Sequence, residues 1–230
     1  MCGFVIGNIF KDEEQFKTAL NLINHRGRDN QLWVVSSNTY MGHNRLSIQG
    51  LNTESNQPMF MDQYVLVYNG ELWKSMDRYK SQFDLKTGSD TELLLNLYNS
   101  KKEECIKDLD GMFGFAVFDE DEESIVFARD FIGRIPLYYY KSCGKIVVAS
   151  ELKSITNSLN INSSEVEIVE PGCYYNFNCK TGILKKTRFY EFPDVDYIEN
   201  MSEDEVMSGI KTLLTNAVDN ELISDVPVCT

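Results

Sequence analysis

Residues 111–119, with the sequence GMFGFAVFD, restrict the fold because both alternating sets of their side chains are apolar. One set is Phe113, Phe115 and Val117, and the other is Met112, Ala116 and Phe118. Successive side chains of a β-strand point to opposite faces of its sheet. A strand that is apolar on both faces is covered on both faces. The segment therefore predicts a strand with a packed layer on each side.

The surrounding segments predict further strands joined by short turns. Strand patterns lie at 3–9, 32–37, 40–48, 64–70, 124–130, 136–140, 145–150, 172–178 and 188–192. Strands that are connected by such short loops pair antiparallel. Helical apolar spacing is found at 11–23, 71–80 and 89–98. Helices around antiparallel strands that are buried on both sides predict an α+β fold, a four-layer αββα sandwich of two antiparallel sheets.

Two capping boxes mark helix starts, Ser89 with Glu92 and Ser202 with Glu205. An apolar stripe at helical spacing follows the second box. Its members are Val206, Ile210, Leu213, Leu214, Ala217 and Val218. The sandwich is therefore expected to be followed by a C-terminal helix.

A change in composition divides the chain after residue 192, where an acidic connector begins. We predict one domain over residues 1–192, a linker over 193–201 and the truncated start of a second domain over 202–230. This division explains why a helix with an apolar face lies at the end of the chain. The alternative is that the helix docks back onto the sandwich.

Charge and cysteine content limit the partners of the chain. A net charge of −13 over 230 residues argues against nucleic acid and anionic membranes, because phosphates attract Lys and Arg. No transmembrane run and no signal peptide is recognisable. The six cysteines show no metal-ligand spacing and nothing indicates secretion. We expect a cytoplasmic protein with reduced thiols and no metal site.

Cys2 directly follows the initiator methionine. Its small side chain permits removal of Met1, which would leave one residue with both a thiol and a free α-amine. Free cysteine has a pKa of roughly 8.5, and an α-amine titrates near ~7.7–8.0, which suits a general base. Together they form the nucleophile and base of covalent catalysis. The alternative is a buried structural cysteine that begins a strand.

Eight segments, in order and in spacing, resemble one known family. They are Cys2-Gly3, GHNRLSI (42–48), YNGELW (68–73), TGSDTE (87–92), LDGMFGFAVFD (109–119), RDFIGRIPLYYY (129–140), VASELKSI (148–155) and EPGCYY (170–175). They look like the glutaminase domain of glutamine-hydrolysing asparagine synthetase, a class II glutamine amidotransferase of the N-terminal-nucleophile hydrolase type. The resemblance covers residues 1–192. The tail, with its SDVPV segment, resembles the first helix and strand of the synthetase domain, and the chain ends before that domain's pyrophosphate loop.

The resemblance implies hydrolysis of L-glutamine to glutamate and ammonia through a thioester on Cys2. The side-chain NH2 of Asn69 and the backbone N–H of Gly70 could hold the tetrahedral oxyanion. One such donor typically lowers the barrier by roughly 3–4 kcal/mol. We expect this pair at the end of a strand. Read alone, Asn-Gly is more typical of a tight turn.

Two charged residues suit the amino-acid head of glutamine. The planar fork of Arg45 fits the α-carboxylate, and Asp90 could receive the α-ammonium. Taken alone, Arg45 could form a surface ion pair, and Asp90 could complement a helix N-terminus. The resemblance further implies that backbone groups line the glutamine pocket, at Arg45, Leu46, Ser47, Ile48, Gln49, Asn69, Gly70 and Glu71.

His25 and His43 are the only histidines. Either could act as the general base for Cys2 in a Cys–His pair, which is an alternative mechanism, although an α-amine base makes a histidine unnecessary. In the family, His25-Arg26-Gly27 belongs to a loop near the active site and is followed by a proline. This chain has Arg28 at that place. The rigid turn that a proline imposes is therefore absent, and the shape of the loop stays open.

The resemblance implies no cofactor for the glutaminase step. ATP and Mg would act only in a synthetase (ATP-pyrophosphatase) module, a domain or separate subunit that amidates aspartate with the released ammonia. The sequence leaves the oligomeric state open, a homodimer included. Two other functions stay open: a catalytically idle binding or assembly module with this fold, and an amidotransferase with a different acceptor.

Overall fold

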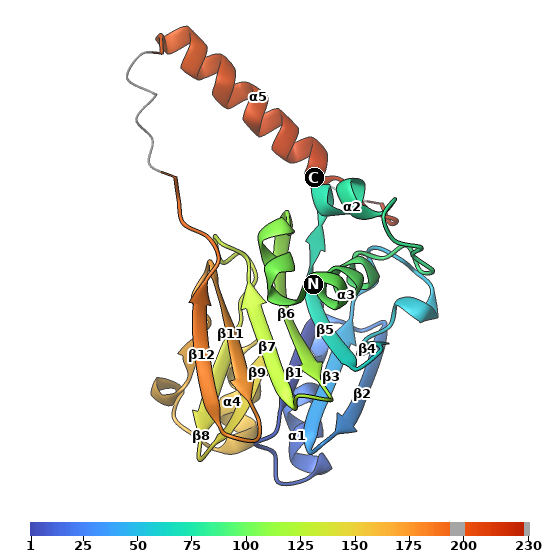
Figure 1. The fold of residues 1–230 in the computed structure, drawn as a ribbon, viewed down its shortest axis with the longest axis vertical. Helices are drawn as coiled ribbons and strands as arrows, with labels where there is room; N and C mark the ends of the chain where they lie inside the picture. Colours follow the sequence, from blue (N-terminus) through green and yellow to red (C-terminus); the bar gives the residue numbers. More distant parts are fainter. Residues whose placement is uncertain (194–200, 228–230) are drawn as a thin grey trace.

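The computed structural model describes residues 1–193 and 201–227, and two antiparallel sheets packed face to face form its body (Figure 1). One sheet has the strand order β10 (Glu167–Ile168), β8 (Tyr138–Ser142), β9 (Lys145–Ala149), β1 (Gly3–Gly7), β3 (Thr39–Arg45) and β2 (Asn30–Ser36). The other has the order β12 (Ile183–Arg188), β11 (Cys173–Asn178), β7 (Ser124–Arg129), β6 (Gly111–Asp119), β5 (Tyr64–Leu72) and β4 (Met59–Met61). The N-terminal strand β1 thus lies inside its sheet, between β9 and β3.

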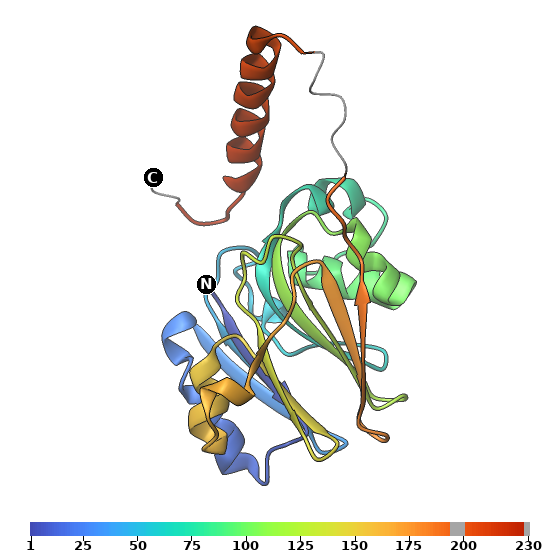
Figure 2. The ribbon, with the colours of Figure 1, turned by 90° about the vertical axis from the view of Figure 1, so that its left-hand side faces the viewer.

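Helices cover the outer face of each sheet, and Figure 2 shows the resulting layers. Helices α1 (Glu13–Asn21) and α4 (Leu152–Leu159) pack on the sheet that contains β1. Helices α2 (Trp73–Tyr79) and α3 (Asp90–Lys101) pack on the sheet that contains β5. The predicted four-layer αββα sandwich is therefore confirmed.

Strand β6 carries the pattern from which the sandwich was predicted. Phe113, Phe115 and Val117 pack on the side of α3. Ala116 and Phe118 pack on the other side, between the two sheets. The two apolar sets thus enter two different cores, because each face of the strand is covered by its own layer.

The predicted end of strand β5 at Asn69-Gly70 is wrong. The pairing with β6 continues from Asn69, opposite Gly114, to Leu72, opposite Gly111. The pair therefore lies within a strand and forms no tight turn. The hydrogen-bonded pairing of β5 with β6 fixes the direction in which the Asn69 side chain and the Gly70 amide point. A mobile turn would not fix these directions.

The predicted bounds differ most for two other strands. Strand β3 ends at Arg45 and not at Ile48, so the segment after Arg45 is a loop. The strand expected at 188–192 lies at 183–188 instead, where six residues pair with β11 as the second arm of a hairpin. The hairpin places its turn at Gly182, which has a φ of 70°.

The capping box predicted at Ser89 is only half formed. The hydroxyl of Ser89 accepts from the backbone N–H of Glu92, as predicted. The Glu92 carboxylate does not return to Ser89, because it accepts from the backbone N–H groups of Lys86 and Thr87. These bonds fix the loop that leads into α3.

Helix α5 (Glu203–Glu221) confirms the predicted C-terminal helix, and its capping box of Ser202 and Glu205 has both bonds. The helix stands away from the sandwich for most of its length (Figures 1 and 2). Its apolar stripe is uncovered in the described residues, with 49–70% exposure at Ile210, Leu213, Leu214 and Val218. Helix α5 therefore does not dock lengthwise onto the sheets.

Parts of the predicted division at residue 192 lie outside the described residues. These are 194–200 of the expected linker and 228–230 of the expected second domain, Cys229 included. In the ranges 1–193 and 201–227, no helix is both long and apolar enough to cross a bilayer.

Candidate active site

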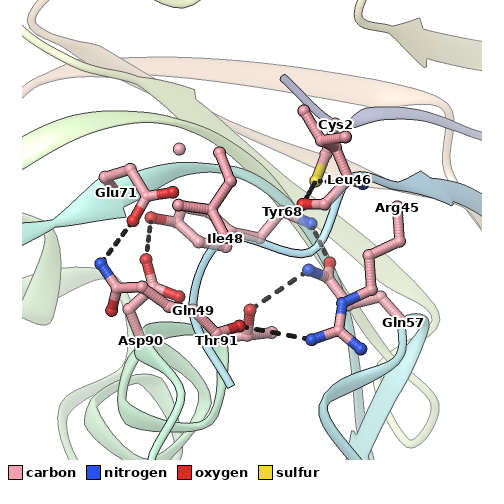
Figure 3. A pocket seen from close by; sticks show the side chains of 11 residues that line it. Cys2, Arg45, Leu46, Ile48, Gln49, Gln57, Tyr68, Glu71, Asp90 and Thr91 are labelled. Atoms are coloured by element: carbon pink, nitrogen blue, oxygen red, sulfur yellow. Dashed lines mark hydrogen bonds between the residues drawn. The ribbon is translucent and has the colours of Figure 1, made fainter. Parts of the chain in front are cut away.

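A polar cavity lies where the start of β1, the loop after β3, the end of β5 and the start of α3 meet (Figure 3). The space free of protein atoms there is about 330 Å³, the open mouth of the cavity included. The lining residues are Cys2, Arg45, Leu46, Ile48, Gln49, Gln57, Tyr68, Gly70, Glu71, Asp90 and Thr91. The fold thus brings most of the predicted site residues to one place. Of that set, Ser47 and Asn69 do not line the cavity.

The thiol of Cys2 forms one end of the cavity and is held by the backbone of Leu46. The thiol donates to the Leu46 carbonyl at 3.4 Å, and the Leu46 N–H donates to the sulfur at 3.3 Å. Burial raises the pKa of the Cys2 thiol, and the hydrogen bond to the Leu46 backbone lowers it in part. An amide donor on the sulfur favours the thiolate, which is the nucleophilic form.

Arg26 fixes the backbone of the same terminus. Its Nε–H donates to the Cys2 carbonyl at 2.7 Å, and its Nη1–H donates to Glu151 at 3.1 Å. Gly3 allows this approach, since a Cβ there would lie 2.8 Å from the Arg26 side chain. Neither Arg26 nor Glu151 had a predicted role, although Arg26 lies in the His25-Arg26-Gly27 loop and Glu151 lies in the VASELKSI segment.

Asn69 and Gly70 are neighbours on β5, the strand that forms one wall of the cavity. The amide nitrogen of Asn69 is buried and has no hydrogen-bond partner among the described residues. A buried donor without a partner is costly, which marks it as a group that a ligand could satisfy. Gly70 lines the cavity, and a Cβ there would lie 2.1 Å from the Met112 carbonyl. Their predicted role, as donors to an oxyanion, stays a prediction.

Two carboxyl groups line the part of the cavity away from Cys2. Asp90 is 5% exposed and accepts from the Tyr68 hydroxyl at 2.8 Å and from the Leu72 N–H at 3.2 Å. Burial raises the pKa of Asp90 to about 6. Burial, and next the nearby Asp90, raises the pKa of Glu71 to about 8. Two crowded carboxyl groups hold protons more tightly, and a cation between them would release those protons.

Arg45 is buried at the cavity wall and forms no surface ion pair with the residues that the structure describes. Its Nη1 donates to the Asn52 carbonyl at 2.9 Å and to the side chain of Asn56, and its Nη2 donates to the carbonyls of Gln49 and Gly50. The guanidinium therefore holds the loop after β3 in its present shape. Its predicted contact with a substrate carboxylate stays a prediction.

The remaining predicted residues belong to the loop after β3. Gln49 donates to Glu71, and Ile48 and Leu46 line the cavity. Ser47 points its N–H to Asp29 at 2.7 Å, away from the lining. This bond, with the Asp29 N–H donating to the Arg45 carbonyl at 3.0 Å, also fixes the loop that carries Arg28 in place of a proline.

Three lining residues had no predicted role: Gln57, Tyr68 and Thr91. Tyr68 and Thr91 lie beside predicted residues within the motifs at 68–73 and 87–92. Gln57 lies in a polar loop that carried no signal. Its side chain joins the other two, accepting from the Tyr68 N–H at 2.6 Å and donating to the Thr91 hydroxyl at 3.2 Å.

Neither histidine is bonded to Cys2 in the part of the chain that the structure describes. His25 pairs with Glu151 at 2.9 Å. The Nε2–H of His43 donates to the Tyr68 carbonyl at 3.0 Å, and burial lowers the pKa of His43 to about 3. The described residues hold no group of three or more His, Cys, Asp and Glu side chains arranged for a metal ion.

Comparison with known proteins gives matches that fit this geometry. The family model described as "glutamine amidotransferase domain" matches residues 1–190. Asparagine synthetase B of Escherichia coli is 32% identical over 90% of this chain and 37% of its own length. Asparagine synthetase 3 of Bacillus subtilis is 28% identical over the whole of this chain and 43% of its own length. The chain thus spans about half or less of the curated relatives that it matches.

A solved structure shows the same fold. The glutamine phosphoribosylpyrophosphate amidotransferase of Bacillus subtilis superimposes with a TM-score of 0.68 at 21% identity, over 83% of this chain and 50% of that one. At this identity the similarity concerns the arrangement of the two sheets and their helices.

Proposed function

The chain belongs to the glutamine amidotransferase domain family, and from this we propose that it hydrolyses L-glutamine to glutamate and ammonia through a thioester on Cys2. One observation carries the proposal: a single cavity has the Cys2 thiol at one end and the carboxyl groups of the buried Asp90 and the half-buried Glu71 at the other. A thiol suits attack on the side-chain amide, and carboxylates suit the α-ammonium. The two ends of a free glutamine thus have complementary groups.

The proposed reaction begins once Met1 has been removed. The free α-amine of Cys2 takes the thiol proton, and the sulfur attacks the amide carbon of the substrate. The oxygen of the tetrahedral intermediate accepts from the Asn69 amide and the Gly70 N–H. The amide nitrogen receives the proton and leaves as ammonia, with formation of the thioester. Water then cleaves the C–S bond, which yields glutamate and restores the thiol.

The head of the substrate is held at the other end. The α-ammonium pairs with Asp90 and Glu71, and the α-carboxylate approaches Arg45 and the backbone of residues 46–49. Since the Arg45 guanidinium already donates to loop carbonyls, the carboxylate would share it with the loop. Charge-assisted bonds of this kind are among the stronger hydrogen bonds in proteins.

We further propose that the ammonia serves the ATP-dependent amidation of aspartate by a synthetase module, with residues 202–230 as its beginning and 193–201 as linker. The two asparagine synthetases above support this, because each extends well beyond the matched part. The uncovered apolar stripe of α5 supports it too, since such a face normally packs against another element. ATP and Mg would belong to that module alone. A cytoplasmic location fits the reduced thiols that the reaction needs.

The test starts with the mass of the purified chain, which should lack Met1. Glutamate and ammonia should then form from glutamine in equal amounts, and a glutamine-like electrophile should add once, to Cys2. Cys2→Ala should abolish both, whereas Cys143→Ala, at an exposed thiol outside the cavity, should change neither. Retention of Met1, or a matured protein that leaves glutamine intact, would contradict the proposal and favour the idle binding module.

A different ammonia acceptor is the other open alternative. Glutamine hydrolysis would be the same with either acceptor. The identity of the acceptor must therefore be tested on a protein that contains the synthetase module. Addition of aspartate and ATP to the longer protein should then yield asparagine and pyrophosphate. Ammonia without asparagine would favour an acceptor other than aspartate.

A further inference from the structure

Tyr68 lines the cavity and lies on β5, directly before Asn69. Its side chain is buried, and its hydroxyl donates to Oδ2 of Asp90 at 2.8 Å (Figure 3 shows both residues). The backbone N–H of Leu72 donates to the same oxygen at the longer distance of 3.2 Å, and the backbone N–H groups of Thr91 and Asp90 also favour the Asp90 anion. Among these hydrogen-bond donors, the Tyr68 hydroxyl is the side chain and has the largest effect on the pKa of Asp90.

We propose that Tyr68 is a positioning residue for glutamine, which holds the Asp90 carboxylate ionised and turned toward the α-ammonium of the substrate. This inference rests on the proposed function and adds to it a residue outside the predicted set. Tyr68 would act only through Asp90, and the reacting amide lies at the other end of the cavity.

The charges around Asp90 explain why such a donor is needed. Asp90 is buried at the first turn of α3, and Glu71 on β5 and the Cys2 thiol face it across the cavity. Arg45 also faces it, but its terminal nitrogens are engaged by loop carbonyls. Burial favours the protonated acid, whereas the Tyr68 hydroxyl favours the anion. Loss of the hydroxyl should therefore keep Asp90 protonated to a higher pH.

The backbone of Tyr68 is fixed independently of its hydroxyl. Its N–H donates to Gln57 at 2.6 Å, and its carbonyl accepts from His43 at 3.0 Å. The ring lies over Gly70, where a Cβ would be 2.9 Å from the Tyr68 Cε2. Tyr68→Phe keeps the ring and these backbone bonds and removes the hydroxyl alone. The variant thus separates the carboxylate contact from the packing of β5.

The experiment measures glutamine hydrolysis by the matured wild type and Tyr68→Phe from pH 5.5 to 8.5. A hydrogen bond to a charged group is worth enough to raise KM by about 10-fold, while kcat should change less than 3-fold, as for an anchor on the substrate head. The acidic limb of kcat/KM should move up by about one pH unit. Tyr139→Phe is the matched control, because its hydroxyl donates to the Glu167 carboxylate on another sheet.

A double-mutant cycle with Asp90→Asn identifies the partner. If Tyr68 acts through Asp90, adding Tyr68→Phe to Asp90→Asn should raise KM by less than 2-fold. An equal effect in both backgrounds, or an unchanged KM and acidic limb in Tyr68→Phe, would overturn the inference. A wild type and a Tyr139→Phe variant that both fail to hydrolyse glutamine would instead refute the proposed function. Should Tyr68→Phe unfold, glutamine titrations of Tyr68→Met, which fills the space with a flexible apolar side chain and has no donor, must show binding weaker than wild type with a shifted pH dependence. Wild-type binding by that variant would count against the inference.

Discussion

At the scale of single residues, two acids in the cavity and one unsatisfied amide next to the lining residue Gly70 carry the proposed function. Asp90 and Glu71 share one end of the cavity, where burial raises both pKa values and the nearby Asp90 raises that of Glu71 further. Asn69 presents a buried NH2 without a partner in the described part of the chain. A site with these features suits a ligand that brings a positive charge and an oxygen acceptor. The amino-acid head and the amide oxygen of glutamine provide both.

Glutamine should bind more tightly as the pH rises through the range from about 6 to 8, where Asp90 and then Glu71 lose their protons. The α-ammonium pairs with the ionised carboxyl groups, so binding should release protons and KM should fall. The same raised pKa values make the empty protein less stable as pH rises toward them. Calorimetry of Cys2→Ala in buffers of different ionisation enthalpy measures the released protons. Binding without proton release would be inconsistent with this.

Asn69→Ala should lower kcat by about 10² to 10³-fold, because it removes a donor to the oxyanion. KM should change little, since the amide would bond mainly to the tetrahedral intermediate. Steady-state glutamate formation measures both constants. Asn176→Ala is a suitable control, because the Asn176 side chain bonds to Glu103 outside the cavity. An unchanged kcat would remove Asn69 from the proposed mechanism.

Strand β5 is the element on which the cavity depends most. It pairs along nine residues with β6 and carries Tyr68, Asn69, Gly70 and Glu71. Because the ladder continues through these residues, their backbone groups cannot adjust independently. The strand thus holds the Asn69 side-chain amide and the Glu71 carboxyl group in fixed positions relative to each other.

Gly70→Ala should destabilise the fold by about 1–3 kcal/mol, because the added methyl group would overpack the space between β5 and β6. Its Cβ would lie 2.1 Å from the backbone oxygen of Met112, so β5 and β6 would have to move apart. Urea unfolding monitored by circular dichroism measures the effect. Gly209→Ala, in α5 with no atom within 4 Å of its Cβ, should be neutral or slightly stabilising. Equal midpoints for wild type and Gly70→Ala would show that the strands accommodate the methyl group.

At the scale of the whole molecule, contacts at and after the end of helix α5 link this helix to the cavity. Helix α5 stands apart, but Glu221 at its end forms a two-bond ion pair with Arg134, at 2.7 and 3.1 Å. The chain then reaches the loop after β3, where the Asp225 N–H donates to the Ile48 carbonyl and the Gly50 N–H donates to the Asp225 carboxylate. A movement of α5 would therefore act on the loop that lines the cavity.

Asp225→Ala should increase the hydrogen-exchange rate of the Gly50 amide, because the carboxylate that accepts from it at 2.8 Å is lost. It should also lower the pKa of Glu71, which the nearby Asp225 charge raises. Hydrogen-exchange mass spectrometry of peptides that cover 46–52 measures the first effect. Asp219→Ala, at an exposed position of α5, should leave exchange unchanged. Equal protection in both variants would show that the contact does not hold the loop.

The layers of the fold and most residues of the candidate site could be predicted from the amino-acid sequence alone. The apolar sets of 111–119 required a layer on each side, and the motifs around Cys2, Asn69 and Asp90 marked the cavity. These features are local, because side-chain periodicity and short motifs are read from neighbouring positions.

Only the tertiary structure decided which distant groups meet. Tyr68 bonds to Asp90 across 22 positions, Arg26 to Glu151 across 125, and Gly50 to Asp225 across 175. It also decided that β5 continues past Gly70, because the facing β6 supplies hydrogen-bond partners that an Asn-Gly pair does not reveal. A hydrogen bond is fixed by distances of about 3 Å between atoms, and packing of the whole chain sets such distances.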